Sequence, residues 1–170
     1  MKFDPRAARN VFILILVPAV IVALFFAFDL RINLTASHVQ VGIWKAFPPV
    51  SVDVGDAVIY NKDEFFSEFP QVRDERMRFR SSSVIKRVAA MPGAMIELFG
   101  VSGDMVMIDG HPYTEGRILD DSWRKIEYPL RVPEGTVWLM ADTDRAYDSR
   151  YHGPMPLRLV REKLKPVFVW

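Results

Sequence analysis

The chain is organised around the stretch Ile85-Lys86-Arg87-Val88-Ala89-Ala90-Met91-Pro92-Gly93. Its β-branched residues predict a strand, and Pro92-Gly93 predicts the turn that ends it. Lys86 stands between apolar neighbours. A buried lysine is costly while it is charged, so its pKa falls and it can act as a base near neutral pH. The alternative is a strand lysine whose side chain reaches solvent.

Composition excludes several kinds of chemistry. The 170 residues suffice for one compact domain plus an appendage. The net charge of +1 gives no reason to expect a nucleic-acid partner. The chain has no cysteine, which excludes a disulfide scaffold, a cysteine nucleophile and a cysteine-based zinc site. The three histidines show no metal-ligand spacing, so no metal or other cofactor is expected.

The apolar residues are concentrated near the N-terminus. Residues 11–28 form an uncharged run of 18 residues, at the lower limit for a membrane-spanning helix. Basic residues outnumber acidic ones before the run but not directly after it, which predicts a cytoplasmic segment over 1–10 and an exported domain over 29–170. A cleaved signal peptide is the competing interpretation, but the run exceeds a typical signal core and no convincing cleavage site follows it.

The rest of the chain has the pattern of a mainly β domain. Short apolar segments alternate with Gly and Pro turns, and Asp109-Gly110 is a strong hairpin signal. This pattern predicts an antiparallel sheet or barrel-like fold. The expected strands include 57–60, 94–99, 104–108, 136–140 and 166–170.

Two segments between the anchor and the lysine strand have their own character. Trp44 and Phe47 are candidates for the lipid headgroup level, where aromatic rings are favoured. Residues 61–83 are rich in charge, with interspersed phenylalanines. We interpret them as a variable surface excursion with a short helix around 64–69, and assign them no chemistry.

Four blocks, taken together and in order, resemble the type I signal peptidase family of membrane-anchored serine proteases with a Ser–Lys dyad. Their order after the anchor matches over nearly the whole chain, apart from residues 61–83 and about 112–131. The lysine and Asp-Ser-Arg blocks are the specific ones. The blocks are Thr35-Ala36-Ser37, residues 55–60, residues 85–93 and residues 148–153.

Departures from the general signal peptidases indicate a particular branch. Ser37 is followed by His38-Val39 in place of the usual Met and nearby proline, and Ala146 falls near the position of a lysine-orienting serine. These features, with the Asn33-x-Thr35-x-Ser37 pattern, are more similar to the conjugal-transfer, TraF-type branch. That branch processes propilin, and some members also join the new ends into a circle.

The resemblance implies a set of site residues. Ser37 would be the nucleophile and Lys86 its base, with Asp148 the aspartate that accompanies them in this branch. The Ser37 backbone N–H and the Thr35 hydroxyl would hold the oxyanion. Asp148 would pair with Arg87 or Arg150, or orient the lysine; the sequence leaves the three open.

Two other interpretations stay open. Ser-His-Asp sites are common among hydrolases, and His152, near Asp148 in sequence, is the plausible rival base. His38 adjoins Ser37, so on a strand it would point to the opposite face, and His111 lies at a hairpin. A non-catalytic anchored scaffold of a secretion or conjugation apparatus is the alternative from another function class.

The expected substrate is a membrane-tethered precursor. Ser37 follows the apolar run by only nine residues, so the site would lie close to the bilayer. The resemblance implies small side chains at positions −1 and −3 of the cut, and a catalytic domain in the periplasm of a bacterial inner membrane. The substrate is then a propilin or, if the protein is a general signal peptidase, a secreted preprotein.

Overall fold

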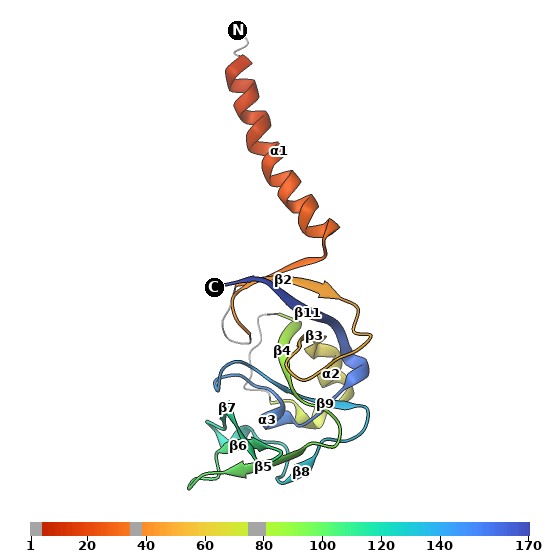
Figure 1. The fold of residues 1–170 in the computed structure, drawn as a ribbon, viewed down its shortest axis with the longest axis vertical. Coiled ribbons are helices and arrows are strands. Elements are labelled where there is room, and N and C mark those ends of the chain that lie inside the picture. Colours follow the sequence, from red (N-terminus) through yellow and green to blue (C-terminus); the bar gives the residue numbers. More distant parts are fainter. Residues whose placement is uncertain (1–4, 35–38, 75–80) are drawn as a thin grey trace.

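The computed structural model describes residues 5–34, 39–74 and 81–170, and for residues 5–9 and 11 the backbone alone. A single long helix, α1 (Pro5–Ala27), projects from a β-rich domain (Figure 1). The strands β1 (Leu30–Asn33), β2 (Gly42–Phe47) and β11 (Val160–Val169) lie closest to the helix.

Helix α1 makes few contacts with the domain, and its apolar side chains are exposed. Phe12, Leu14 and Phe26 are 63%, 73% and 78% exposed. Within the described part of the chain, no helix combines the length and the apolarity that crossing a membrane requires. The predicted transmembrane anchor over 11–28 is therefore not confirmed by the structure.

The described strands form two antiparallel sheets, which confirms the prediction of a mainly antiparallel β fold. Of the two predicted forms, a sheet or a barrel-like fold, the described strands adopt the sheet. The larger sheet has the order β1-β2-β11-β3-β4-β9-β10, and the smaller one β7-β6-β5-β8. The remaining strands are β3 (Ala57–Asn61), β4 (Ser83–Ala90), β5 (Met95–Phe99), β6 (Met105–Ile108), β7 (His111–Arg117), β8 (Leu130–Arg131), β9 (Thr136–Met140) and β10 (Met155–Pro156).

The lysine stretch forms β4, an interior strand between β3 and β9. Its burial alternates, with Val84, Lys86 and Val88 buried and the residues between them half-buried. Because successive side chains of a strand point to opposite faces, Lys86 shares its face with the two valines. Both valines belong to the main core, so the lysine side chain lies against apolar residues.

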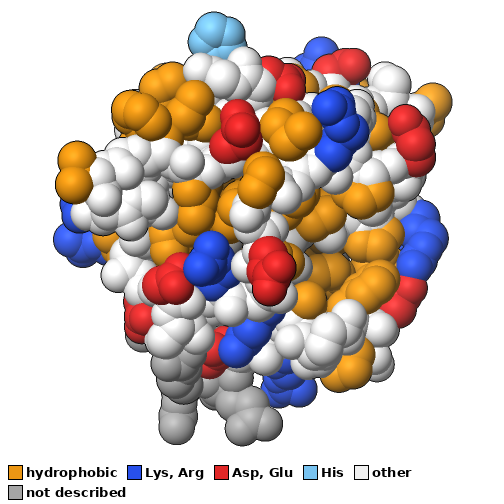
Figure 2. All heavy atoms as spheres, turned by 90° about the horizontal axis from the view of Figure 1, so that it is seen from below, with side chains coloured by type: hydrophobic (Ala, Val, Ile, Leu, Met, Phe, Trp, Pro, Cys, Tyr) orange, Lys and Arg blue, Asp and Glu red, His pale blue; other side chains and the backbone are white. Residues whose placement is uncertain are grey.

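The hairpin prediction is also confirmed. Asp109 and Gly110 join β6 to β7 with φ values of 50° and 77°, as a two-residue turn with two positive φ angles requires. The smaller sheet that contains this hairpin lies at the end of the molecule away from α1 (Figure 1). Seen from that end, apolar side chains cover much of the surface, with charged side chains among them (Figure 2).

The interpretation of residues 61–83 as a surface excursion is wrong for its first part. A short helix, α2 (Lys62–Glu68), is present close to its predicted place. However, its Phe65 and Phe66 are 1% and 7% exposed and belong to the main core. The charged residues that dominate the composition of the segment gave no sign that these two phenylalanines are buried. A short helix buries only one side, so charged and buried residues can occur along the same helix.

Trp44 does not lie at an interface. It is 2% exposed in a second, smaller core with Val39, Ala46, Ala57 and Leu164. The alternation of β2 turns Trp44 inward and Lys45 and Phe47 outward. The expectation of a headgroup position is therefore wrong for Trp44.

Candidate active site

Lys86 is buried in a way that is uncommon for a lysine. It is 1% exposed, and within the described residues its Nζ has no hydrogen-bond partner. It lies across from Val58 on the neighbouring strand β3. Lysines are almost never fully buried without a partner unless their chemistry requires it.

Burial controls the ionisation of this lysine. It lowers the pKa of Lys86 from 10.5 to about 8, while the charge of Asp148 acts in the opposite direction. Arg150 lowers the same pKa further, and Asp142 raises it. A substantial fraction of the Lys86 side chains is therefore neutral just above neutral pH, as a general base requires.

Asp148 pairs with Arg150, which decides between the partners that the sequence left open. Both side chains are 0% exposed. The Arg150 Nε and Nη2 donate to the two carboxylate oxygens at 2.8 and 2.7 Å. Burial alone would raise the pKa of Asp148, but the charge and hydrogen bonds of Arg150 outweigh it and hold that pKa below its usual value.

The same arginine holds the surrounding chain together. Its Nη1 donates to the carbonyl oxygens of Glu115 and Arg117 in β7, and its Nη2 to that of Thr143. Asp148 in turn caps the short helix α3 (Ser149–His152) and accepts from the Ala141 N–H. The Asp148–Arg150 pair therefore fixes the loop that follows β9 and ties it to the smaller sheet.

Arg87 has a different carboxylate partner. It forms a bidentate pair with Asp142, at 2.7 Å from Nε and 2.6 Å from Nη2, and its Nη1 donates to the Gly55 carbonyl. Strand alternation places Arg87 on the face opposite to Lys86. Asp142 was not predicted as a site residue, although its charge acts on both Arg87 and Lys86.

Ser37, Thr35 and His38 lie outside the described residues. The chain beside them is firmly held, since Val39 is fully buried and its carbonyl accepts from the Asn33 side chain at 2.8 Å. The roles of Ser37 and Thr35 therefore stay predictions. Ser149 is also buried, and its Oγ accepts from the Leu139 N–H, so it supports α3.

His152 lies in an aromatic environment. Its ring centroid is 5.0 Å from that of Phe65 and 5.6 Å from that of Tyr147, and its Nδ1 lies 2.8 Å from the Gly153 carbonyl oxygen. Burial lowers its pKa to about 4. A base of that strength is poorly matched to chemistry near pH 7, so Lys86 is the better-matched base of the two.

We predict that His152 makes the fold sensitive to acid. Its depressed pKa means that the unfolded chain takes up the proton first as pH falls from about 6.5 towards 4. Wild type should lose roughly 2 kcal/mol of unfolding free energy from this group between pH 7 and pH 5, and His152→Phe should lack that loss. Urea unfolding at both pH values measures it. His111→Phe, at an exposed hairpin position, should behave as wild type.

Among the described residues, no group of three His, Asp or Glu side chains is placed to hold a metal ion. What the site does contain is a buried amine, a buried Asp–Arg pair that fixes the adjoining loop, and a second Asp–Arg pair on the other face of β4. This arrangement suits a hydrolase with a lysine base.

Comparisons with known proteins agree with this class. The family model described as signal peptidase, peptidase S26, matches residues 7–170. The chain belongs to this family, and its membership implies a serine peptidase.

Three curated relatives are similar in sequence. A conjugal transfer protein TraF of Agrobacterium fabrum is 34% identical over 91 residues, which cover 51% of this chain and 49% of that protein. A probable TraF of Sinorhizobium fredii is 34% identical over 74% of this chain and 70% of its own length. A probable thylakoidal processing peptidase of Arabidopsis thaliana is 28% identical over 67% of this chain, but only 34% of its own length is matched.

A solved structure is also similar, that of a signal peptidase I from Enterococcus faecalis V583. It is 21% identical, with a TM-score of 0.39, and the match covers 65% of this chain and 93% of that chain.

Proposed function

We propose that this protein is a membrane-anchored serine endopeptidase that uses a Ser37–Lys86 dyad to cleave a membrane-tethered precursor, a conjugative propilin. The observation that carries the proposal is the full burial of Lys86, with a pKa lowered to about 8, in a member of the signal peptidase family. The propilin is suggested by the two relatives named as conjugal transfer proteins.

The proposed mechanism begins with the neutral lysine. Lys86 Nζ accepts the proton of the Ser37 hydroxyl while the serine oxygen attacks the scissile carbonyl. The oxyanion is held by the Ser37 backbone N–H and the Thr35 hydroxyl. Lys86 then donates the proton to the leaving amine, and water releases the acyl group. A peptide amine in place of water would instead close the product into a circle.

In this scheme, the arginines and Asp148 act by position and charge. Asp148 and Arg150 fix the loop after β9 and have opposite effects on the pKa of Lys86. Arg87 holds Asp142, which is the other carboxylate that acts on that lysine. Asp148, Arg150 and Arg87 therefore support the dyad and carry no proton in the reaction.

A lipid bilayer is part of the same proposal. The exposed apolar side chains of α1 continue into Phe28, Ile32 and Phe168, which are 56%, 53% and 61% exposed at the base of the helix. Lipid would cover these residues and bring a tethered precursor to the site. The proposed location is the inner membrane, with the N-terminus cytoplasmic and the catalytic domain periplasmic.

The test is co-expression of a propilin with wild type, Ser37→Ala or Lys86→Ala, followed by intact mass spectrometry. A product shortened only by wild type supports the Ser–Lys peptidase, and a further loss of one water shows cyclisation. Cleavage of a secreted preprotein but not of the propilin would indicate a general signal peptidase. An unchanged precursor in every case, with both substrates, would contradict the proposal and favour the scaffold.

A further inference from the structure

A polar groove of about 530 Å³ borders the candidate site and is not used by the proposed mechanism. It lies between β7 and the loop that follows β9, and its walls come from four separate parts of the chain. The lining residues are Gln40, Arg87, Pro112, Tyr113, Thr114, Glu115 and Asp142.

A bulge in β7 builds one wall of this groove. Pro112 pairs with Met107 and Arg117 pairs with Met105, so the residues between Pro112 and Arg117 have too few partners on β6 and leave the ladder. Gly116 permits this path, since a Cβ there would lie 2.8 Å from the Tyr113 carbonyl oxygen. The bulge carries the side chains of Tyr113, Thr114 and Glu115 into the groove wall.

One of the residues that line the groove connects it to Lys86. Arg87 is next to Lys86 in the chain but projects from the opposite face of β4, where it pairs with Asp142. Asp142 lines the groove and also acts electrostatically on Lys86. A peptide whose scissile bond lies at the dyad would therefore continue into this groove at one end.

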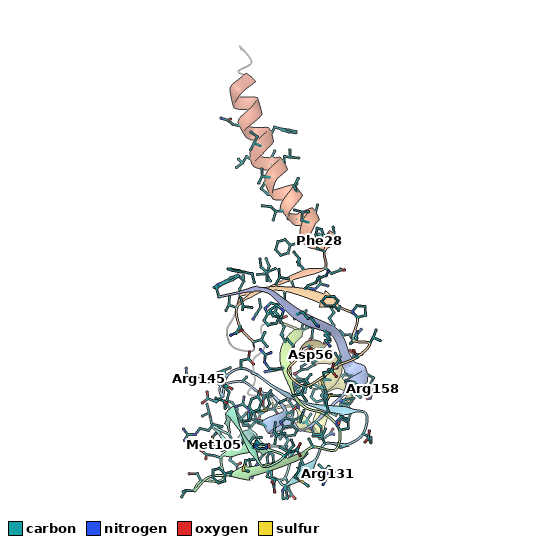
Figure 3. The ribbon with its side chains drawn as sticks, viewed as in Figure 1. Phe28, Asp56, Met105, Arg131, Arg145 and Arg158 are labelled. Carbon is teal, nitrogen blue, oxygen red and sulfur yellow. The ribbon has the colours of Figure 1, made fainter. Side chains whose placement is uncertain are left out.

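The direction of that peptide follows from the fold. The hydrophobic segment of a tethered precursor would lie near α1 and the strands β1, β2 and β11, whereas β7 belongs to the sheet at the opposite end (Figure 1). Arg145, in the loop after β9, projects on the same side of the molecule as β7 (Figure 3). The groove thus suits the segment downstream of the cut, which leads away from the membrane.

The charges of the groove leave one carboxylate in excess. Arg87 and Asp142 neutralise each other in their bidentate pair. The Glu115 carbonyl accepts from Arg150, but within the described residues no ion pair includes its carboxylate, and the side chain is half-buried. The groove therefore presents one uncompensated negative charge beside the hydrogen-bonding groups of Gln40 and Thr114.

We propose that this groove binds the first residues downstream of the cut and that Glu115 selects a basic side chain there. The inference rests on the proposed peptidase function. Glu115 is a specificity-determining residue in this account and takes no part in proton transfer. The preference is electrostatic, so it weakens as ionic strength rises.

The test uses synthetic peptides that span the cut of the precursor and carry a single Lys or a single Glu at each of the first four downstream positions. Wild type should cleave the best Lys peptide about fivefold faster, by kcat/KM, than its Glu counterpart. Glu115→Lys should reverse this preference, so that the Glu peptide becomes the faster of the two. The matched control Glu134→Lys, in an exposed turn, makes the same charge change elsewhere and should keep the wild-type preference.

The outcomes separate this inference from the function on which it rests. If cleavage depends on Ser37 and Lys86 but Glu115→Lys leaves the peptide preference unchanged, the groove assignment is wrong and the peptidase stands. If no peptide is cleaved, the binding of labelled peptides to the Ser37→Ala protein, measured by fluorescence anisotropy, decides. Tighter binding of the Lys peptides than of the Glu peptides would still support the groove, provided that Glu115→Lys abolishes the difference. Equal binding of all the peptides would overturn it.

Discussion

Replacement of Lys86 by methionine should abolish precursor cleavage and at the same time stabilise the fold. The loss of activity should be on the order of 10³-fold or more, since removal of a dyad member leaves only the residual contribution of binding and the oxyanion site. The gain in stability has a separate cause. Methionine fills a similar volume without a charge, so the burial that lowers the pKa of Lys86 to about 8 no longer opposes folding.

The size and the pH dependence of this gain can be stated. A shift from 10.5 to about 8 corresponds to roughly 3 kcal/mol of unfolding free energy. The cost is fully present below pH 8, where both states are charged, and it disappears between pH 8 and pH 10.5 as the folded state loses its proton first. Wild type should therefore gain stability over that range, and Lys86→Met should not.

Chemical unfolding at pH 7 and pH 10 measures the effect. Lys45→Met is the matched control, because Lys45 is an exposed lysine on β2 and its removal should change neither activity nor the pH dependence. Full activity of Lys86→Met would rule out the lysine as base. Loss of activity together with loss of the folded state would mean that Lys86 is needed for structure instead.

Asp148→Asn should be the most destabilising single change at the site. In the wild type both side chains of the Asp148–Arg150 pair are 0% exposed. The variant therefore leaves the Arg150 guanidinium buried without a counter-charge. Removing the charge of one partner of a buried ion pair lowers the unfolding free energy by about 3–5 kcal/mol. Asp148→Asn with Arg150→Met should recover part of this loss, because no unpaired charge is then left inside. Thermal unfolding of the single and double variants measures both effects.

The activity of folded Asp148→Asn distinguishes positioning from proton transfer. Asp148 raises the pKa of Lys86, so its neutralisation should move the acid limb of the pH–rate profile to lower pH. Asp121→Asn, which removes an exposed carboxylate paired with Arg124, should change the stability by less than about 1 kcal/mol. A stable Asp148→Asn protein with no activity at any pH would contradict the positioning role.

Much of the fold could be predicted because local patterns determine it. The Asp109-Gly110 hairpin and the strand Thr136–Met140 follow from turn chemistry and apolar runs, and both are present. Burial of Lys86 was one of the two interpretations that its apolar neighbours allowed, and the structure shows the side chain buried. The two buried phenylalanines of α2 were missed, because charged neighbours dominate the composition of that segment.

The pairing of the ionic groups could not be predicted in the same way. Asp148 pairs with Arg150 and Arg87 with Asp142, whereas the sequence allowed Asp148 to take either arginine. Asp142 and Arg87 are far apart along the chain and meet only because β4 and β9 are neighbours in the sheet. Such pairings depend on tertiary register, which no local pattern specifies. Asp142 is nonetheless the first charged residue after an apolar strand, two positions beyond Met140, and that signal was available.

The most direct measurement of the central claim is the rate at which purified wild-type protein, in lipid vesicles, shortens the precursor between pH 5 and pH 10. If neutral Lys86 is the base, kcat/KM should rise with pH and level off above an apparent pKa of about 8. Activity that is already maximal at pH 5 would contradict the lysine mechanism, and would instead match a base such as His152, whose pKa is about 4.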